Sequence, residues 1–325
     1  MLEGISKIAP FVESYLEFRI SLGYRLNPSG SVLRNLDIFL GRNADLTAYT
    51  FDSWLQTQYE ITQNVRRVRI FMIIKFCKYR QRFEPECFIP GVYTIPKRIE
   101  TNSNYIFTNA QILALLRETL NIRDKSLNRL KSANLRLSIV LLYTTGMRIG
   151  ELAKLKIEDY NHTDKTLLIR ETKFYKSRII PLSNDASSCL DSYLEERIHL
   201  GIEIHGGSAL IKNCLRKNIF YNPGTLSNQI ISLMKNLHIE TNLRKSPRVH
   251  DFRHTFAIHR ILQWYKDGFD INSKLIYLTI YMGHSGIQST EHYLRDAGKL
   301  TSVAVGLFGK NCEHIIRIDN NEKTS

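Results

Sequence analysis

The sequence predicts a mainly α-helical protein with one small β-sheet, in which a helical N-terminal domain precedes an α+β C-terminal domain. Its 325 residues suggest two domains, since domains average roughly 150 residues. Apolar residues recur at helical spacing along most of the chain, whereas β-branched residues and leucine flank a polar turn only once. An aperiodic stretch with Pro85, Pro90 and Pro96 separates the halves. We expect a first domain over residues 1–92, a linker over 93–104 and a second domain over 105–325.

Four segments with helical periodicity make up the expected first domain. Residues 10–22 place Phe11, Tyr15 and Phe18 on one face, and further helices are predicted over 32–40, 51–59 and 63–80. The apolar side of the last helix, which we expect to face the core, carries Val65, Val68, Met72 and Phe76. Its other side is basic and carries Arg66, Arg67, Arg69, Lys75, Lys78 and Arg80.

The expected second domain begins at Thr108-Asn109-Ala110-Gln111, a capping box before an apolar helix. A helix over 133–143 is ended by Gly146, and another begins near Arg148. Two strands, 166–170 and 178–182, should form a hairpin. The remaining predicted helices are 185–200, 225–237, 250–265, 271–282 and a short one at 290–294.

The charge of the chain indicates a polyanionic partner. The formal net charge is +14, with nucleic acid as the first candidate and an anionic membrane surface as the second. No apolar run is long enough to cross a bilayer, and residues 1–10 lack the pattern of a signal peptide. The 5 cysteines are scattered and form no CxxC, which favours reduced thiols in a cytoplasmic protein.

Basic residues that could contact a DNA backbone lie in three places: the last helix of the first domain, the linker and the hairpin. A charge run on a helix is most often only a solvated face, but nearly every charge on this helix is positive. A phosphate-facing surface is therefore at least as good an interpretation. The candidates are Arg66, Arg67, Arg69, Lys75, Lys78, Lys97, Arg98, Lys176 and Arg178.

Transfer of a phosphodiester without a metal needs a nucleophilic hydroxyl, fixed cations for the developing charge and a proton donor for the leaving oxygen. Arginine suits the second task because its planar guanidinium binds phosphate through two donors, and Lys or His suits the third. Each candidate alone has an ordinary explanation, such as a solvated surface residue or a core tyrosine. The candidates along the chain are Arg148, Lys173, His250, Arg253, His284 and Tyr293.

The ordered set of these residues resembles the tyrosine recombinase, or phage integrase, family. The first motif is Thr145-Gly146-Met147-Arg148-Ile149-Gly150-Glu151-Leu152, and the hairpin supplies Lys173, Lys176, Arg178, Pro181 and Leu182. The second motif runs from His250 through Arg253 to Ala257, followed by Gly283-His284 and Tyr293 at the family's usual interval, 293 − 284 = 9. The interval from Arg148 to Lys173, 173 − 148 = 25, resembles Xer-type members. The resemblance covers about residues 105–300.

The resemblance implies a mechanism. Tyr293 would attack the scissile phosphate and form a 3′-phosphotyrosyl intermediate without ATP. Arg148 and Arg253 would stabilise the pentacoordinate phosphorus, and Lys173 would protonate the leaving 5′-oxygen. His250 would assist proton transfer, and His284 would orient the phosphate. Two further acids, Glu151 and Asp251, should orient the arginines or support the fold, while His254 should point into the core.

The resemblance also implies an assembly and a biological setting, that of a prokaryotic, nucleoid-associated protein. The two domains would form a C-shaped clamp on double-stranded DNA that carries a specific site, in a homo-oligomer of four chains. The apolar C-terminal residues could pack on a neighbouring chain or on their own domain; they are Leu300, Val303, Val305, Leu307 and Phe308. The interval from His250 to His284, 284 − 250 = 34, is longer than in compact members, with the extra residues within 263–274 around Gly268. This length is more similar to recombinases of transposons and other mobile elements.

Other interpretations stay open at this point. A type IB topoisomerase uses similar residues but relaxes DNA without joining partners, although Gly283-His284 and His250 favour the recombinase. A non-catalytic DNA-binding regulator could keep the fold, but all six catalytic positions hold suitable residues. A membrane-surface protein lacks an amphipathic anchor. His250 and His254 have the spacing of a metal pair, but no HExxH glutamate or third ligand accompanies them, so we expect no metal and no cofactor.

Overall fold

The computed structural model divides into two compact units, Met1–Thr101 and Asn102–Ser325. The division lies within the stretch that was predicted as a linker. Each unit has its own core, and each is described by itself. The structure describes residues 6–24, 27–99, 104–123, 128–170, 177–214, 220–240, 247–284, 286, 290–294 and 296–298.

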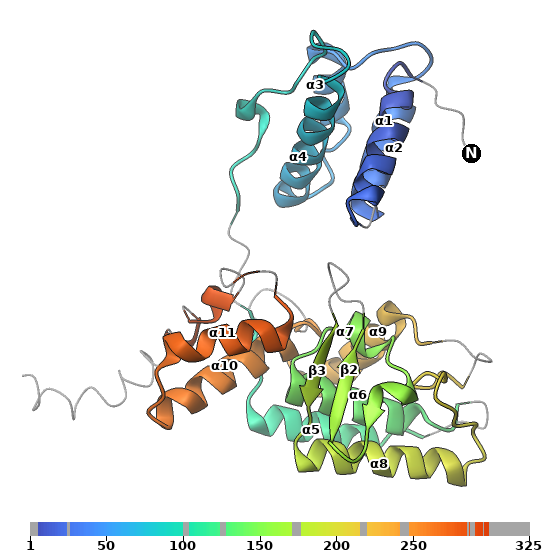
Figure 1. Ribbon diagram of the computed structural model, residues 1–325, viewed down its shortest axis with the longest axis vertical. Coiled ribbons are helices and arrows are strands. Elements are labelled where there is room, and N and C mark those ends of the chain that lie inside the picture. Colours follow the sequence, from blue (N-terminus) through green and yellow to red (C-terminus); the bar gives the residue numbers. More distant parts are fainter. Residues whose placement is uncertain are drawn as a thin grey trace, which may run out of the picture. The chain divides into compact units, whose positions relative to one another are not determined.

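The first unit is helical, as predicted (Figure 1). Its helices are α1 (Ala9–Ser21), α2 (Asn27–Leu40), α3 (Ala48–Gln56) and α4 (Gln63–Arg80). Thr47 caps α3 through a reciprocal box with Thr50, and α4 packs against both α1 and α2. The core of this unit includes Leu33, Phe51 and Trp54.

The predicted orientation of α4 was wrong. Val65 and Val68 are 44% and 50% exposed, and the helix instead turns Ile70, Ile73 and Cys77 into the core. Of the apolar side that the sequence predicted, only the C-terminal half faces inward, where Phe76 is fully buried. Apolar residues stand on more than one side of this helix, so its packing against α1 and α2 decided which of them are covered.

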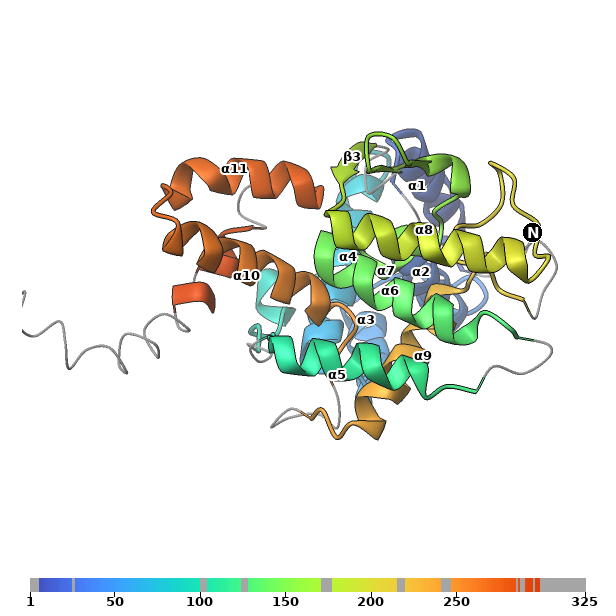
Figure 2. The same cartoon turned by 90° about the horizontal axis from the view of Figure 1, so that it is seen from below.

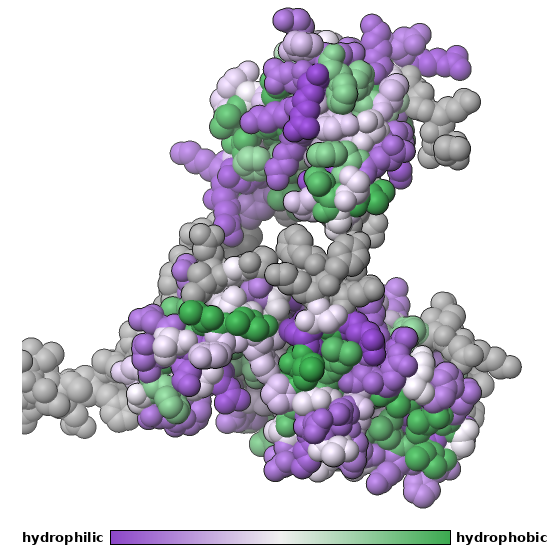
Figure 3. Space-filling view, viewed as in Figure 1, coloured by the Kyte–Doolittle hydropathy of each residue, from purple (hydrophilic) through white to green (hydrophobic). Residues whose placement is uncertain are grey.

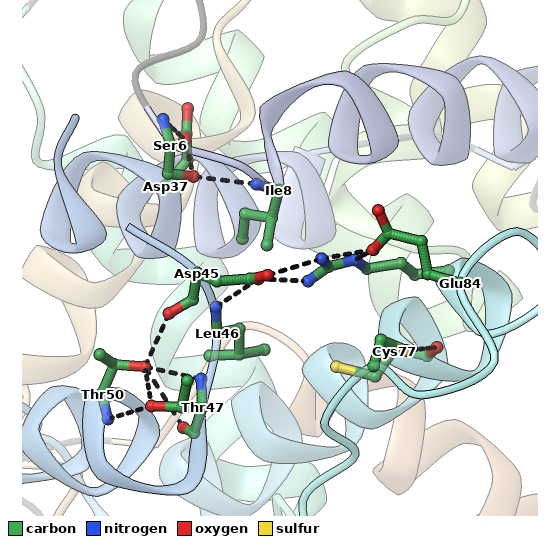
Figure 4. A network of polar contacts seen from close by, with 11 residues as sticks. Ser6, Ile8, Asp37, Asp45, Leu46, Thr47, Thr50, Cys77 and Glu84 are labelled. Atoms are coloured by element: carbon green, nitrogen blue, oxygen red, sulfur yellow. Dashed lines mark hydrogen bonds and ion pairs between the residues drawn. The ribbon is translucent and has the colours of Figure 1, made fainter. Parts of the chain in front are cut away.

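Arg80 is a second correction, because it belongs to the core and not to a basic surface. Its side chain is 5% exposed and donates to Asp45 Oδ1 at 2.6 Å and to Glu84 Oε2 at 2.6 Å. Figure 4 shows Asp45 and Glu84 approaching the same point from opposite sides, beside the capping box of α3. The hydrogen bond from Arg80 lowers the pKa of Asp45, and the pair joins α4 to the segment before α3.

The segment after α4 is held against the first unit. The side chains of Gln63 and Asn64 donate to the carbonyls of Lys97 and Ile99 at 2.8 and 2.7 Å. Arg67 Nη1 donates to the carbonyl of Pro96 at 2.7 Å. Residues 96–99 of the predicted linker are therefore tied to the first turns of α4.

The second unit packs helices against a small antiparallel sheet (Figures 1 and 2). Among the described residues the strand order is β1-β2-β3, and β2 pairs with β3 in the predicted hairpin with Leu167 opposite Ile180. The two-residue strand β1 was not predicted. The bounds are α5 (Asn109–Leu120), α6 (Lys131–Thr145), α7 (Ile149–Leu152), β1 (Tyr160–Asn161), β2 (Thr166–Ile169), β3 (Arg178–Pro181), α8 (Asn184–His199), α9 (Pro223–Asn236), α10 (Asp251–Lys266) and α11 (Ile271–Met282).

The extra residues that the sequence placed within 263–274 lie in a helical hairpin, in which a short turn joins α10 to α11. α10 ends at Lys266, Gly268 adopts φ +73°, and Asp270 caps α11 by accepting from the backbone N–H groups of Asn272 and Ser273. The outer side of α11 is apolar, with Ile276 and Ile280 54% and 65% exposed. Figure 3 shows these side chains as a hydrophobic band over the helix. No helix among the described residues is both long and apolar enough to span a membrane.

Candidate active site

The first motif places Arg148 in the turn between α6 and α7. Gly146 ends α6 in the left-handed conformation, φ +61°, and a Cβ there would lie 2.5 Å from the ring of Phe256. Arg148 then caps α7 in an extended conformation. Its backbone N–H donates to Glu151 Oε2 at 3.0 Å, and its Nη1 donates to Glu151 Oε1 at 2.7 Å. The Arg148 side chain remains 32% exposed, which leaves part of its guanidinium open to a ligand.

Arg253 lies in the interior, between the C-terminal ends of two helices. It is 1% exposed, and it donates to the carbonyls of Gly146 at 2.8 Å and Met282 at 2.6 Å. Carbonyls at helix C-termini lack partners within the helix and carry partial negative charge, so they suit a cation. Burial, together with the charge of Arg148, lowers the pKa of Arg253 to about 10. The residue stays charged at neutral pH, and its position is fixed by α6 and α11.

Arg178 also lies in this polar cluster, although the sequence suggested a contact with the DNA backbone. Its side chain is 10% exposed, and its Nε donates to the carbonyl of Tyr281 at 2.9 Å. Its Nη groups donate to Glu151 at 3.3 and 2.7 Å. Burial alone would raise the pKa of Glu151, but Arg178 and Arg148 outweigh it and lower the pKa. Glu151 thus holds two arginines, as expected for a residue that orients them.

Two histidines flank the arginines, at the start of α10 and after α11. His284 follows Gly283, which ends α11 at φ +65°, and its Nδ1 lies 2.7 Å from the Thr290 hydroxyl. Partial burial and the positive charge of Arg253 lower the pKa of His284 to about 3 and that of His250 to about 4. Both imidazoles are therefore neutral at pH 7. His250 lies at the N-cap of α10, where part of its surface reaches solvent.

Tyr293 lies against His284 and His254. Its ring centroid is 6.1 Å from that of His284 and 5.3 Å from that of His254. The tyrosine is 1% exposed and belongs to the small core formed by α10 and α11. Burial raises the pKa of Tyr293, while charge and a hydrogen bond from Arg253 act in the opposite direction. The phenol is consequently neutral and adjacent to a buried cation.

The structure brings five of the six predicted catalytic residues into one region, where interactions join the ends of α6, α10 and α11 to the tyrosine. The sixth, Lys173, lies outside the described residues, and so does Lys176. Sequence reasoning missed Thr290, which is fully buried and bonds to His284. Its place three residues before Tyr293, one helical turn, was the available signal. His254 is 6% exposed as expected, but it packs on the tyrosine.

The predicted DNA contacts of the first unit fall into two groups. Arg66 donates to the carbonyl of Gln58 at 2.7 Å, and Arg69 donates to the Gln58 side chain. These two and Arg67 are half-buried, whereas the other four candidates are exposed: Lys75, Lys78, Lys97 and Arg98. Within the described part of the chain, no group of three His, Cys, Asp or Glu side chains could hold a metal ion.

Comparison with known proteins agrees with this arrangement. The phage integrase family matches residues 106–299. A Sinorhizobium fredii protein designated integrase/recombinase y4rB is 26% identical over 90% of this chain and 94% of its own length. The tyrosine recombinase XerD of Staphylococcus saprophyticus is 31% identical over 56% of this chain and 55% of its own.

Solved structures show the same fold. The XerH site-specific recombinase bound to palindromic difH substrate, in a post-cleavage complex, has a TM-score of 0.64 at 18% identity, with 86% of this chain and 78% of that chain covered. The Tn1549 transposon integrase in complex with transposon right end DNA has a TM-score of 0.62 at 15% identity, with 91% and 99% covered. On its matched residues and on the convergence of its motifs, the chain belongs to the phage integrase family of tyrosine recombinases.

Proposed function

We propose that this chain is a site-specific DNA recombinase that cuts and rejoins strands through a covalent bond between Tyr293 and a DNA 3′-phosphate. The observation that carries the proposal is the convergence of Arg148, Arg253 and His284 on one tyrosine, from elements far apart in the sequence. Fixed cations beside a hydroxyl are what phosphoryl transfer without a metal requires.

Arg148 would bind a non-bridging oxygen of the scissile phosphate, and the buried Arg253 would add positive charge beside it. Arg148 has an exposed part that can meet a phosphate, and Glu151 fixes its direction. Arg253 is held by the carbonyls at two helix ends, so its charge would act on the phosphate from a fixed position beside the tyrosine. Preorganised cations need not be rearranged as charge develops on phosphorus, which is why they lower the barrier.

In the cleavage step, the bond from Tyr293 Oη to phosphorus forms and the bond from phosphorus to the 5′-oxygen breaks. The phenol proton would pass to a neutral imidazole, for which we favour His250, because a bound phosphate would raise its lowered pKa. Lys173 would give a proton to the leaving 5′-oxygen. The phosphodiester energy is kept in the covalent intermediate, so we expect neither ATP nor a metal ion to be needed.

The substrate would be double-stranded DNA with a specific recombination site, bound by a homo-oligomer. The net charge of +14 favours a polyanion, and the similar structures include a lambda integrase tetramer bound to a Holliday junction. Integration or excision of a mobile element is the role we favour, because of the S. fredii relative's designation and the long interval from His250 to His284. An exchange of strands needs several active sites together, which favours a tetramer.

The test is covalent trapping on nicked DNA in EDTA. Purified protein is mixed with DNA from the ends of its own genetic element, nicked near the expected crossover so that the cut strand diffuses away. A denaturing gel should show a protein–DNA adduct for the wild type and none for Tyr293→Phe. Tyr277→Phe is the matched control, because Tyr277 is 66% exposed on α11 and outside the site.

Each outcome has a definite meaning. An adduct that persists in Tyr293→Phe would show that another residue is the nucleophile. Salt-sensitive DNA binding without any adduct would favour the non-catalytic regulator. Relaxation of arbitrary plasmids without a preferred site would favour topoisomerase activity over recombination.

A further inference from the structure

Arg178 joins three elements of the active site through one guanidinium. It begins β3, its Nε donates to the carbonyl of Tyr281 at 2.9 Å, and its Nη groups donate to Glu151 at 3.3 and 2.7 Å. Glu151 belongs to α7, and Tyr281 is the penultimate residue of α11. The sequence suggested a surface contact with DNA, yet this side chain is 10% exposed and most of its donors are used internally.

The guanidinium also packs on the backbone that leads to His284. A Cβ placed on Gly283 would lie 2.8 Å from Arg178 Nη1, and Gly283 adopts φ +65°. The glycine is therefore needed both for its conformation and for the approach of Arg178. The carbonyl of Gly283 lies 3.5 Å from Nη2 of Arg148, so both arginines face the same turn.

Each carboxylate oxygen of Glu151 accepts from both arginines. Oε1 accepts from Arg148 Nη1 at 2.7 Å and from Arg178 Nη1 at 3.3 Å. Oε2 accepts from the backbone N–H of Arg148 at 3.0 Å and from Arg178 Nη2 at 2.7 Å. Without Arg178 this half-buried carboxylate would keep only Arg148, which would be drawn toward it and away from a phosphate.

We propose that Arg178 is a positioning residue for strand cleavage, a role that rests on the proposed function. It holds Glu151 so that the Arg148 guanidinium stays directed at the phosphate, and it holds the turn before His284. Arg178 also begins β3, so the same contacts fix the start of the strand that pairs with β2.

Arg178→Lys separates this role from DNA binding and from folding. Lysine keeps the charge, but its single ammonium cannot bond to both oxygens of Glu151 and to the Tyr281 carbonyl at once. We expect single-turnover cleavage of the nicked DNA at saturating protein to slow by about tenfold to a hundredfold, as for a misplacement of reacting groups by about 1 Å. DNA affinity and its salt dependence should remain close to those of the wild type. The melting temperature should fall, because buried acceptors lose a donor, so cleavage is measured at a temperature where the variant is folded.

Two comparisons make the test specific. In Lys75→Ala, which removes an exposed basic side chain, we expect the opposite pattern, with weaker and less salt-dependent binding but unchanged cleavage at saturation. In a double-mutant cycle with Glu151→Gln, the rate loss from Arg178→Lys should be clearly smaller than in the wild-type background, because part of its role acts through that carboxylate.

The proposal has clear contrary results. Wild-type cleavage by Arg178→Lys with weakened DNA binding would make Arg178 a phosphate contact, and additive losses in the cycle would mean that it acts independently of Glu151. Either result leaves the function of Tyr293 intact. Absence of any wild-type adduct would instead refute the proposed function and this role with it.

Discussion

Replacement of Gly146 by alanine should destabilise the second unit and disturb its active site. A non-glycine residue in the left-handed conformation costs about 1–2 kcal/mol, and Gly146 has φ +61°. The new Cβ would also lie 2.5 Å from the ring of the buried Phe256, and such overpacking costs about 1–3 kcal/mol. Alanine lowers the entropy of the unfolded chain, which returns about 0.4–1 kcal/mol. We therefore expect a net loss of about 2–4 kcal/mol.

Two other glycines separate these contributions. Gly268 has φ +73° but open space around it, so Gly268→Ala should cost only the backbone strain, a net loss of about 1 kcal/mol or less. Gly150 lies in α7 with open space and no positive φ, so Gly150→Ala should be neutral or stabilising by up to about 1 kcal/mol. The difference in unfolding free energy between Gly146→Ala and Gly268→Ala measures the cost of the contact with Phe256.

The assay is urea unfolding followed by tryptophan fluorescence. The chain has 2 tryptophans, and in a Trp54→Phe background only Trp264 on α10 reports, which restricts the signal to the second unit. Gly146→Ala should also slow cleavage, since the carbonyl of Gly146 accepts from Arg253 at 2.8 Å. Equal stability of Gly146→Ala and Gly268→Ala would refute the steric part of the reasoning. Unchanged cleavage would refute the link to Arg253.

Three further predictions concern charge and buried polar groups. Burial lowers the pKa of His254 and of His284 to about 3, so the unfolded state binds more protons than the native state below pH 6.5. The contribution of these imidazoles to the free energy of unfolding should therefore be complete above that pH and fall toward pH 3, by up to about 1.4 kcal/mol per pH unit for each imidazole. Urea unfolding at several pH values should show a weaker pH dependence for His254→Phe. Arg80→Met should lower the stability of the first unit, followed by thermal melting, by about 1–3 kcal/mol, because Asp45 and Glu84 lose their partner but can reach water. An unchanged stability would mean that these ion pairs contribute no more than pairs on the surface. Thr290→Val keeps the side-chain shape but removes the hydroxyl 2.7 Å from His284, so thermal melting should show a loss of stability of about 1–3 kcal/mol. A cleavage rate equal to that of the wild type would exclude a role of Thr290 in holding His284.

Local signals in the sequence were sufficient for the helices, the hairpin and the motifs that meet at the candidate site. The capping box at Thr108 and the Gly146 end of the following helix appear in the structure where they were predicted. Such signals act over a few residues, because capping groups and left-handed glycines satisfy their own helix ends. The catalytic set was recognisable for a related reason, since its order and spacing can be read without knowing what each side chain contacts.

The environment of individual side chains was decided by packing between distant elements. Val65 and Val68 are exposed because α4 presents Ile70 and Ile73 to α1 and α2 instead. Arg80 is buried because Asp45, 35 residues away in the chain, lies opposite it. A basic residue on a helix has the same local sequence whether it faces solvent or a carboxylate, so periodicity cannot separate the two cases.

At the active site, the environment of Arg178 was likewise decided by packing and not by the local sequence. The sequence by itself determined that an arginine begins the second strand of the hairpin, and its charge suggested a surface contact with phosphate. Only the tertiary structure placed Glu151 and the Tyr281 carbonyl within 2.7 and 2.9 Å of it, from α7 and α11. A buried guanidinium needs several acceptors at fixed angles, and those acceptors exist together only after the helices have packed.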